Sequence, residues 1–127
     1  MRPRRLYETV VYAGDLQAAL AFYRDVLGLR QVDDFAFRLD DGGMLLLFDP
    51  VLSSQPGRPV PSHGATGVGH VAFSVGDGEL DAWREELRAQ GVEPEQEKEW
   101  TRGGRSIYVR DPAGNSVELV EGDLWRR

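Results

Sequence analysis

Hydrophobic and polar residues follow two different periods along this chain of 127 residues. Two stretches have apolar residues three and four positions apart, which predicts amphipathic helices. The first follows Asp15, whose side chain suits an N-cap, and ends at Gly28. The second begins at Asp77 or Gly78 and ends at Gly91. The apolar stripes of the two predicted helices are formed by Leu16, Leu20, Tyr23 and Leu27 and by Leu80, Trp83 and Leu87.

One strand is predicted before each helix and three after it. In chain order these strands cover residues 6–13, 29–33, 35–39 and 44–49, and then 68–75, 92–97, 106–110 and 116–121. Both halves therefore have the order β-α-β-β-β, and we expect one α+β domain over residues 1–127. Its tandem modules should lie at about residues 4–50 and 67–122. Residues 51–66 are rich in proline, serine and glycine, which predicts a linker or surface loop.

The repeat places Glu8 and His70 at equivalent positions, because each lies seven residues before the aspartate that precedes the helix of its half. Strand alternation turns His70 away from the helix side of its sheet and puts Glu118 on the same open face. If the halves are related by a pseudo-two-fold axis, one concave surface gathers Glu8, His70 and Glu118. The same alternation directs three further side chains to the open face, those of Ser106, Tyr108 and Arg110.

An imidazole and two carboxylates are ligands for a divalent first-row metal ion, with Mn, Fe, Ni, Co and Zn as the candidates. The chain has no cysteine, so a metal ion must be held by His, Asp or Glu. The same three side chains also suit a Glu–His–Glu hydrogen-bond cluster or charges in a wet groove. His63, in the loop between the halves, is an extra ligand, a lid residue or an ordinary loop histidine. The residue pattern alone leaves these alternatives open.

Residues near the predicted ligands offer contacts for a small molecule. Ser106 is a candidate substrate contact, and Tyr108 is either a catalytic hydroxyl donor to an anionic oxygen or an aromatic wall. Arg110 and Arg38, at matching places in the two halves, either bind an anion or carry rim charges. The first half contributes an apolar wall that suits the hydrophobic flank of a substrate or a dimer surface. The wall is formed by Val10, Tyr12, Met44, Leu46 and Phe48.

Composition narrows the range of partners. With 41% hydrophobic and 28% charged residues the chain resembles soluble globular proteins, and no apolar run approaches the ~20 residues of a membrane span. A net charge of −6 argues against nucleic acid as the main partner. The basic start of the chain is not followed by the apolar core of a secretion signal, so we expect a cytoplasmic protein. The expected partner is a small-molecule substrate.

Three strings resemble a known family: "DLQAALAFYRDVLGL" at 15–29, "GHVAFSV" at 69–75 and "RDPAGNSVELVEG" at 110–122. They are similar to the vicinal oxygen chelate superfamily, which includes glyoxalase I, fosfomycin-resistance and bleomycin-resistance proteins and extradiol dioxygenases. The resemblance implies paired βαβββ modules whose U-shaped mixed sheet surrounds a metal ion. Its four ligand positions fall on Glu8, Leu46, His70 and Glu118, of which Leu46 has no atom that can coordinate.

The resemblance also implies a function. We expect a metal-dependent enzyme of the glyoxalase type, a lyase or isomerase, in which the metal ion chelates two adjacent oxygens of the substrate. Glu118 or Glu8 would then serve as both ligand and general base. Members of the superfamily commonly pair, so we expect a homodimer. The alternatives are a bleomycin-resistance-like binding protein without chemistry and an iron-dependent dioxygenase, whose site usually has two histidines.

Overall fold

The structure, a computed structural model, describes residues 1–126 and divides into two compact units. The first unit comprises Met1–Gly67, and the second begins at Val68. Each unit contains one four-stranded sheet of mixed direction. None of the helices in the described part of the chain is long and apolar enough to cross a membrane.

The first unit builds its sheet in the order β1-β4-β3-β2. Its first strand runs parallel to its last, while the other neighbours are antiparallel. The elements are β1 (Glu8–Tyr12), α1 (Leu16–Ala21), η1 (Phe22–Val26), β2 (Arg30–Asp33), β3 (Ala36–Arg38), β4 (Met44–Phe48) and α2 (Pro50–Ser53).

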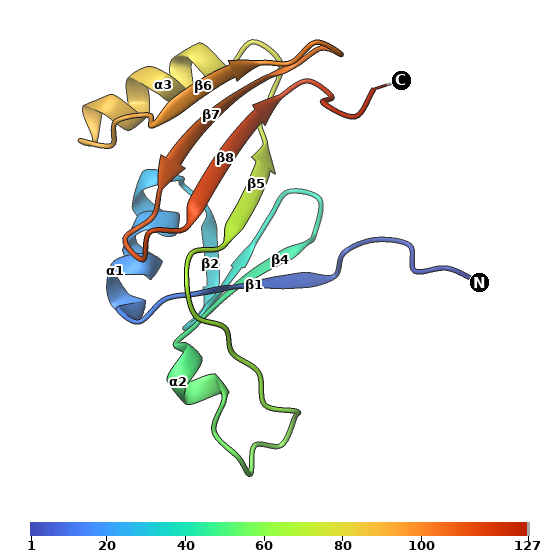
Figure 1. Cartoon of the computed structure of the whole chain (residues 1–127), viewed down its shortest axis with the longest axis vertical. Helices are drawn as coiled ribbons and strands as arrows, with labels where there is room; N and C mark the ends of the chain where they lie inside the picture. Colours follow the sequence, from blue (N-terminus) through green and yellow to red (C-terminus); the bar gives the residue numbers. More distant parts are fainter. Residues whose placement is uncertain (127) are drawn as a thin grey trace. The chain divides into compact units, whose positions relative to one another are not determined.

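The second unit repeats this topology with the order β5-β8-β7-β6, again with the first and last strands parallel. Figure 1 shows the four strands side by side. The elements are β5 (His70–Ser74), α3 (Leu80–Ala89), β6 (Gln96–Glu99), β7 (Arg105–Arg110) and β8 (Ser116–Glu121). The predicted α+β architecture of two βαβββ modules is therefore confirmed.

The strand registers of the two units correspond residue by residue. Glu8 begins β1 and pairs with the first residue of β4, just as His70 begins β5 and pairs with the first residue of β8. Two residues further along these last strands lie Leu46 and Glu118. The equivalence of Glu8 with His70, which the sequence spacing predicted, is thus a property of the sheets, and Leu46 occupies the register position of Glu118.

The helix of the first unit begins and ends as its sequence predicts. The Asp15 carboxylate accepts a hydrogen bond from the backbone N–H of Ala18 at 3.1 Å, which satisfies one of the free donors of the first turn. After α1 the helix widens into the π-helical turn η1, where the Leu27 N–H donates to the Phe22 carbonyl at 3.1 Å. Gly28, with a φ of +72°, then ends the helix in a conformation that favours glycine.

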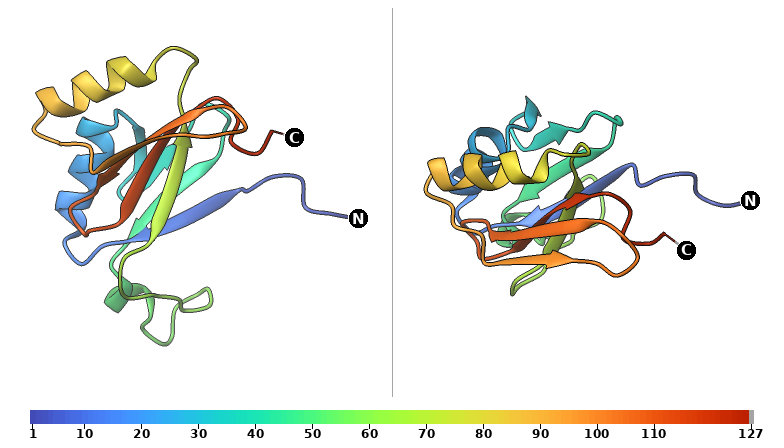
Figure 2. Two further views of the ribbon diagram at one scale, coloured as in Figure 1. Left: turned by 45° about the horizontal axis from the view of Figure 1, so that its top comes forward. Right: turned by 90° about the horizontal axis from the view of Figure 1, so that it is seen from above.

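Helix α3 covers one face of the second sheet and packs on β7 and β8 (Figure 2). Strand alternation gives that face its apolar character, because every second residue of β7 and β8 points to the helix. The helix side chains that meet this face come from Leu80 and Leu87, which are at most 1% exposed. The buried strand residues on this face are Ile107, Val109, Val117 and Leu119.

Three features differ from the prediction. Helix α3 begins at Leu80, after Glu79 as its N-cap residue, and not at Asp77 or Gly78. The region expected to be an irregular linker contains most of the short helix α2, because Asp49 caps it by accepting from the Val51 N–H at 2.9 Å and Pro50 supplies a helical φ. The strand expected at 92–97 is instead β6, which covers Gln96–Glu99. It starts later because the Val92 N–H is used to close α3, donating to the Leu87 carbonyl at 2.8 Å.

The start of α3 is fixed to β8 by Glu121, and this contact predicts a pH dependence. The Leu80 N–H donates to one Glu121 oxygen at 3.1 Å and Arg105 donates to the other at 3.0 Å. Both contacts, the Leu80 N–H first, hold the pKa of Glu121 below its usual value of 4.5. A lowered folded-state pKa means that the stabilisation is present above pH 4.5 and is lost as the pH falls through the lowered pKa.

We therefore expect Glu121→Gln to lower the free energy of unfolding at pH 7 and to lose less stability than the wild type between pH 4.5 and pH 2. Urea unfolding at a series of pH values measures both effects. Glu85→Gln, on the exposed side of α3, is the matched control and should track the wild type. Parallel wild-type and Glu121→Gln curves over the whole pH range would contradict the assignment.

Candidate functional site

His70 projects from the start of β5 with its ring oriented by the neighbouring strand. Its Nδ1 lies 3.1 Å from the Ser116 carbonyl oxygen of β8. A carbonyl only accepts, so Nδ1 carries a hydrogen, and Nε2 is the ring nitrogen that has a lone pair in the neutral form of the side chain. That Nε2 lies 3.3 Å from the Glu118 Oε1, and the His70 side chain is 52% exposed. The ring therefore presents a basic nitrogen beside a carboxylate and open to solvent.

Glu118 is the buried member of this pair, with only 5% of its surface exposed. Its Oε2 accepts a hydrogen bond of 2.5 Å from the Ser106 hydroxyl of β7. The Ser106 oxygen in turn accepts from the Trp100 indole N–H at 2.9 Å. A buried carboxylate needs such donors, because removal from water penalises its charge. Both oxygens of Glu118 thus have a defined neighbour, Ser106 on one side and His70 on the other.

Tyr108 completes the cluster on the open face of the second sheet. It lies directly opposite Glu118 in the β7–β8 register, and its ring stacks on His70 with centroids 6.5 Å apart. Partial burial raises the pKa of Tyr108, and the Glu118 carboxylate raises that pKa further. The phenol therefore stays protonated at neutral pH and can donate a hydrogen bond. The prediction that His70, Tyr108 and Glu118 share one face agrees with this arrangement.

The turn between β7 and β8 aligns β5 with its neighbour. Asp111 accepts from the backbone N–H groups of Ala113 and Asn115, both at 2.9 Å. The Asn115 side chain donates to Asp111 at 2.9 Å and accepts from the Gly69 N–H at 2.7 Å. Because Gly69 directly precedes His70, this turn fixes the residue that carries the imidazole. The DPAGN motif at 111–115 thus has a structural role, which is to form this turn and to bind the residue before His70.

The His70–Glu118 pair suits a divalent metal ion by its donor set. Two atoms with lone pairs, Nε2 and Oε1, face each other, and a hydrogen bond to Nδ1 orients the imidazole as it does in many metal-binding histidines. Within either unit the residues described, 1–126, include no group of three His, Asp or Glu side chains arranged to hold a metal ion. Glu8 is an exposed residue of the first unit, and its role as third ligand stays a prediction.

The other predicted contacts of the second unit have partners within that unit. Ser106 is 1% exposed, and its hydroxyl already serves Trp100 and Glu118. Arg110 pairs with the exposed Glu95 at 3.0 Å and donates to the Gly114 carbonyl at 3.1 Å. Ser106 therefore holds Glu118 by a hydrogen bond, and the Arg110 guanidinium bridges the residue before β6 and the turn between β7 and β8. In the first unit, Arg38 ends β3 as an exposed residue.

His63 lies against the predicted apolar wall of the first unit. Its Nδ1 is 2.6 Å from the Tyr12 hydroxyl, and its ring meets the Phe48 ring edge-on with centroids 5.2 Å apart. The buried Ser53 at the end of α2 fixes its backbone: the Ser53 hydroxyl donates to the His63 carbonyl at 2.6 Å, and the His63 N–H donates to the Ser53 carbonyl at 3.0 Å. The sequence left His63 as an extra ligand, a lid residue or an ordinary loop histidine. Its contacts are those of a loop histidine that connects the loop to β1 and β4.

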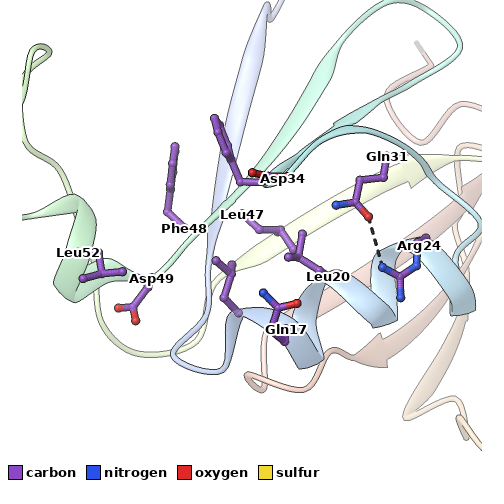
Figure 3. A pocket seen from close by; sticks show the side chains of 11 residues that line it. Gln17, Leu20, Arg24, Gln31, Asp34, Leu47, Phe48, Asp49 and Leu52 are labelled. Carbon is purple, nitrogen blue, oxygen red and sulfur yellow. Dashed lines mark hydrogen bonds between the residues drawn. The ribbon is translucent and has the colours of Figure 1, made fainter.

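A pocket of about 420 Å³ adjoins the same wall. Figure 3 shows Gln17 and Leu20 of α1 near Leu47, with Leu52 at one end of the pocket and the hydrogen bond between Arg24 and Gln31 at the other. Arg24 belongs to the π-helical turn η1, and its guanidinium also pairs with Asp25 at 2.9 Å. The first unit thus has an apolar surface next to a pocket lined by both apolar and polar side chains, and Phe48 contributes to both.

Comparison with known proteins identifies the family. Residues 5–119 match the Glyoxalase/Bleomycin resistance protein/Dioxygenase superfamily. The chain belongs to this superfamily. The match covers both βαβββ units and includes the His70–Glu118 pair, so the resemblance predicted from the three sequence strings is confirmed.

Individual members of the glyoxalase superfamily show how far the similarity extends. A crystal structure of lactoylglutathione lyase from Agrobacterium tumefaciens is similar at 45% identity, with a TM-score of 0.92 and 98% of each chain covered. The lactoylglutathione lyase of Haemophilus influenzae is 30% identical over an alignment of 129 positions that covers 92% of each chain. The metallothiol transferase FosB of Shouchella clausii is 37% identical over 60 residues, covering 46% of this chain and 41% of that protein.

Two contacts of this superfamily member, those of Trp100 and of His63, were not predicted from the sequence. Trp100 lies in a turn and belongs to no periodic pattern, so only the structure shows that it supports Glu118 through Ser106. The contact between Tyr12 and His63 spans 51 residues and involves a proline-rich segment expected to be a plain loop. The short signal Asp49-Pro50, an N-cap followed by proline, could have revealed α2 and with it a fixed start for that loop.

The Tyr12–His63 hydrogen bond predicts a measurable contribution to stability. Tyr12→Phe removes the hydroxyl and keeps the ring, so we expect the free energy of unfolding to fall by about 1 kcal/mol. Urea unfolding measures the change, and Tyr7→Phe on the exposed Tyr7 is the matched control. Equal stability of the Tyr12→Phe and Tyr7→Phe variants would show that the Tyr12–His63 bond contributes nothing.

Proposed function

We propose that this chain is a metal-dependent enzyme of the glyoxalase type that binds two adjacent oxygens of a small-molecule substrate at a divalent ion. One observation carries the proposal: His70 Nε2, its tautomer fixed by the Ser116 carbonyl, faces the buried Glu118 carboxylate at 3.3 Å. A solvent-open nitrogen next to a buried carboxylate is the arrangement that a cation completes. Zn, Ni, Mn, Fe and Co remain the candidate ions for such nitrogen and oxygen ligands.

The relatives support the class of reaction. Proteins named lactoylglutathione lyase align with more than nine tenths of the chain, one of them at 45% identity. We extend from these names to a lyase or isomerase that acts on a substrate with vicinal oxygens. The substrate itself is unidentified, and its expected apolar flank rests on the wall residues Tyr12, Leu46 and Phe48 of the first unit.

The residues of the second unit have separate roles in this proposal. His70 and Glu118, with Glu8 as the predicted third ligand, would hold a divalent ion, which would supply Lewis-acid polarisation of substrate oxygens. The Tyr108 phenol, protonated at neutral pH, donates to an oxygen that gains negative charge. Glu118 and Glu8 are the carboxylates that can accept a proton from the substrate. Arg110 and Arg38 stay candidate contacts for an anionic group at the rim.

The replacement of the fourth ligand by leucine favours a second candidate function. Leu46, at the register position of Glu118, has no donor atom, which is what a binding protein that sequesters its ligand without chemistry would tolerate. The retained His70–Glu118 pair favours the enzyme. An iron-dependent dioxygenase is the third alternative, and oxygen consumption with a bound ferrous ion would identify it.

Metal binding tests the proposal directly. We expect the purified wild type to bind about one equivalent of Zn²⁺ or Ni²⁺ in calorimetric titration. Glu118→Gln should weaken binding at least about 10-fold because a carboxylate ligand becomes a neutral amide. Glu85→Gln, on the exposed side of α3, should bind as the wild type does. A wild type that carries no stoichiometric divalent ion and binds none on titration would leave the sequestering protein as the function.

The proposed enzyme is expected to act as a homodimer, as members of this superfamily commonly do. Light scattering should then give twice the 14.2 kDa mass of the chain. A single species at 14.2 kDa would exclude the dimer. A cytoplasmic location stays a prediction of the sequence.

A further inference from the structure

We propose that Trp100 is a positioning residue for the metal ligand Glu118 and acts through the Ser106 hydroxyl. The inference rests on the proposed function, because it concerns a carboxylate that is to hold a metal ion. Trp100 does not face the imidazole or the carboxylate itself. Its indole N–H donates to Ser106 at 2.9 Å, and Ser106 donates to Glu118 at 2.5 Å.

The chemistry of the three groups fixes the direction of both hydrogen bonds. An indole nitrogen can only donate, so the Ser106 oxygen must act as the acceptor toward Trp100. A serine hydroxyl has one hydrogen, which is then left for Glu118 Oε2. Removing the indole N–H takes away a donor that restricts rotation of the Ser106 hydroxyl. Trp100 therefore sets the orientation of the donor that holds the buried side of the carboxylate.

The β6–β7 hairpin holds Trp100 in place. The Trp100 N–H donates to the Gly104 carbonyl and the Gly103 N–H donates to the Trp100 carbonyl, both at 3.0 Å. Gly104 has a φ of +87°, and a Cβ atom there would lie 2.8 Å from the Glu121 carbonyl oxygen, so only glycine fits this turn. Lys98, the only lysine of the chain, lies over the indole ring at 5.3 Å.

The distribution of tryptophan between the units agrees with this role. All three tryptophans, Trp83, Trp100 and Trp125, belong to the second unit. The first unit has Leu46 at the register position of Glu118 and thus no carboxylate that needs a donor behind it. Trp100 and Ser106 therefore occur in the unit that has the buried Glu118 carboxylate, and the βαβββ topology by itself does not require them.

Three variants test the inference by their affinity for Zn²⁺. Trp100→Phe keeps an aromatic ring and removes the N–H, and Ser106→Ala removes the hydroxyl. We expect each to raise the Zn²⁺ dissociation constant about 10-fold, the lower end of the range for outer partners of metal ligands. The double variant should be no weaker than Ser106→Ala, because Trp100 then has no hydroxyl to orient. Trp125→Phe, at an 83% exposed position, is the matched control.

A second readout needs no variant. The indole N–H signals of the three tryptophans can be followed by nuclear magnetic resonance while Zn²⁺ is added to the wild type. We expect the Trp100 signal to shift in proportion to metal bound and the exposed Trp125 signal to stay in place. Urea unfolding of each variant identifies a change in affinity that results from loss of the fold.

The outcomes separate this inference from the proposed function. If the wild type binds no Zn²⁺, the proposed function fails and the inference fails with it. If the wild type binds Zn²⁺ and folded Trp100→Phe binds equally well with an unmoved Trp100 signal, only the inference is overturned. Additive losses in the double variant would also overturn it, because Trp100 would then act by a route other than Ser106.

Discussion

The buried charge of Glu118 is the constraint on which the open face of the second unit depends. An ionised carboxylate with 5% exposure is costly unless charge and hydrogen bonds compensate it. The Ser106 hydroxyl donates a hydrogen bond to Oε2, and the other oxygen, Oε1, lies 3.3 Å from His70 Nε2, where a proton or a cation would compensate the charge. The arrangement also explains why Ser106 is as deeply buried as the apolar residues of its strand. The proposed metal site and the stability of the second sheet therefore depend on the same side chains.

Sheet topology brings these groups together from distant parts of the sequence. In each unit the first strand lies beside the last one, so β5 and β8 are neighbours although 41 residues separate the end of one from the start of the other. The Asp111–Asn115 turn then fixes the offset between them through the Gly69 N–H. His70 meets Ser116 and Glu118 because of this offset. A different register would bring other residues of β8 to the imidazole.

Much of the fold and part of the site could be predicted from local signals. Asp15, Gly28 and Gly91 bound the helices because caps and positive-φ glycines are encoded within a few residues. Alternation sufficed to place His70 and Glu118 on one face, since a strand has a strict period of two. Contacts that bridge loops have no such period, which is why the partners of Trp100 and His63 needed the structure.

Because the registers of the two sheets match, residues of one unit can be assigned to equivalent residues of the other. Each position on β1 and β4 has a counterpart on β5 and β8, down to the residue that starts each strand. For a protein engineer, this makes strand exchange between the halves a defined operation. Segments can be transplanted with their face and their neighbours known beforehand. Leu46 then marks a register position where one half carries an apolar side chain and the other half a carboxylate.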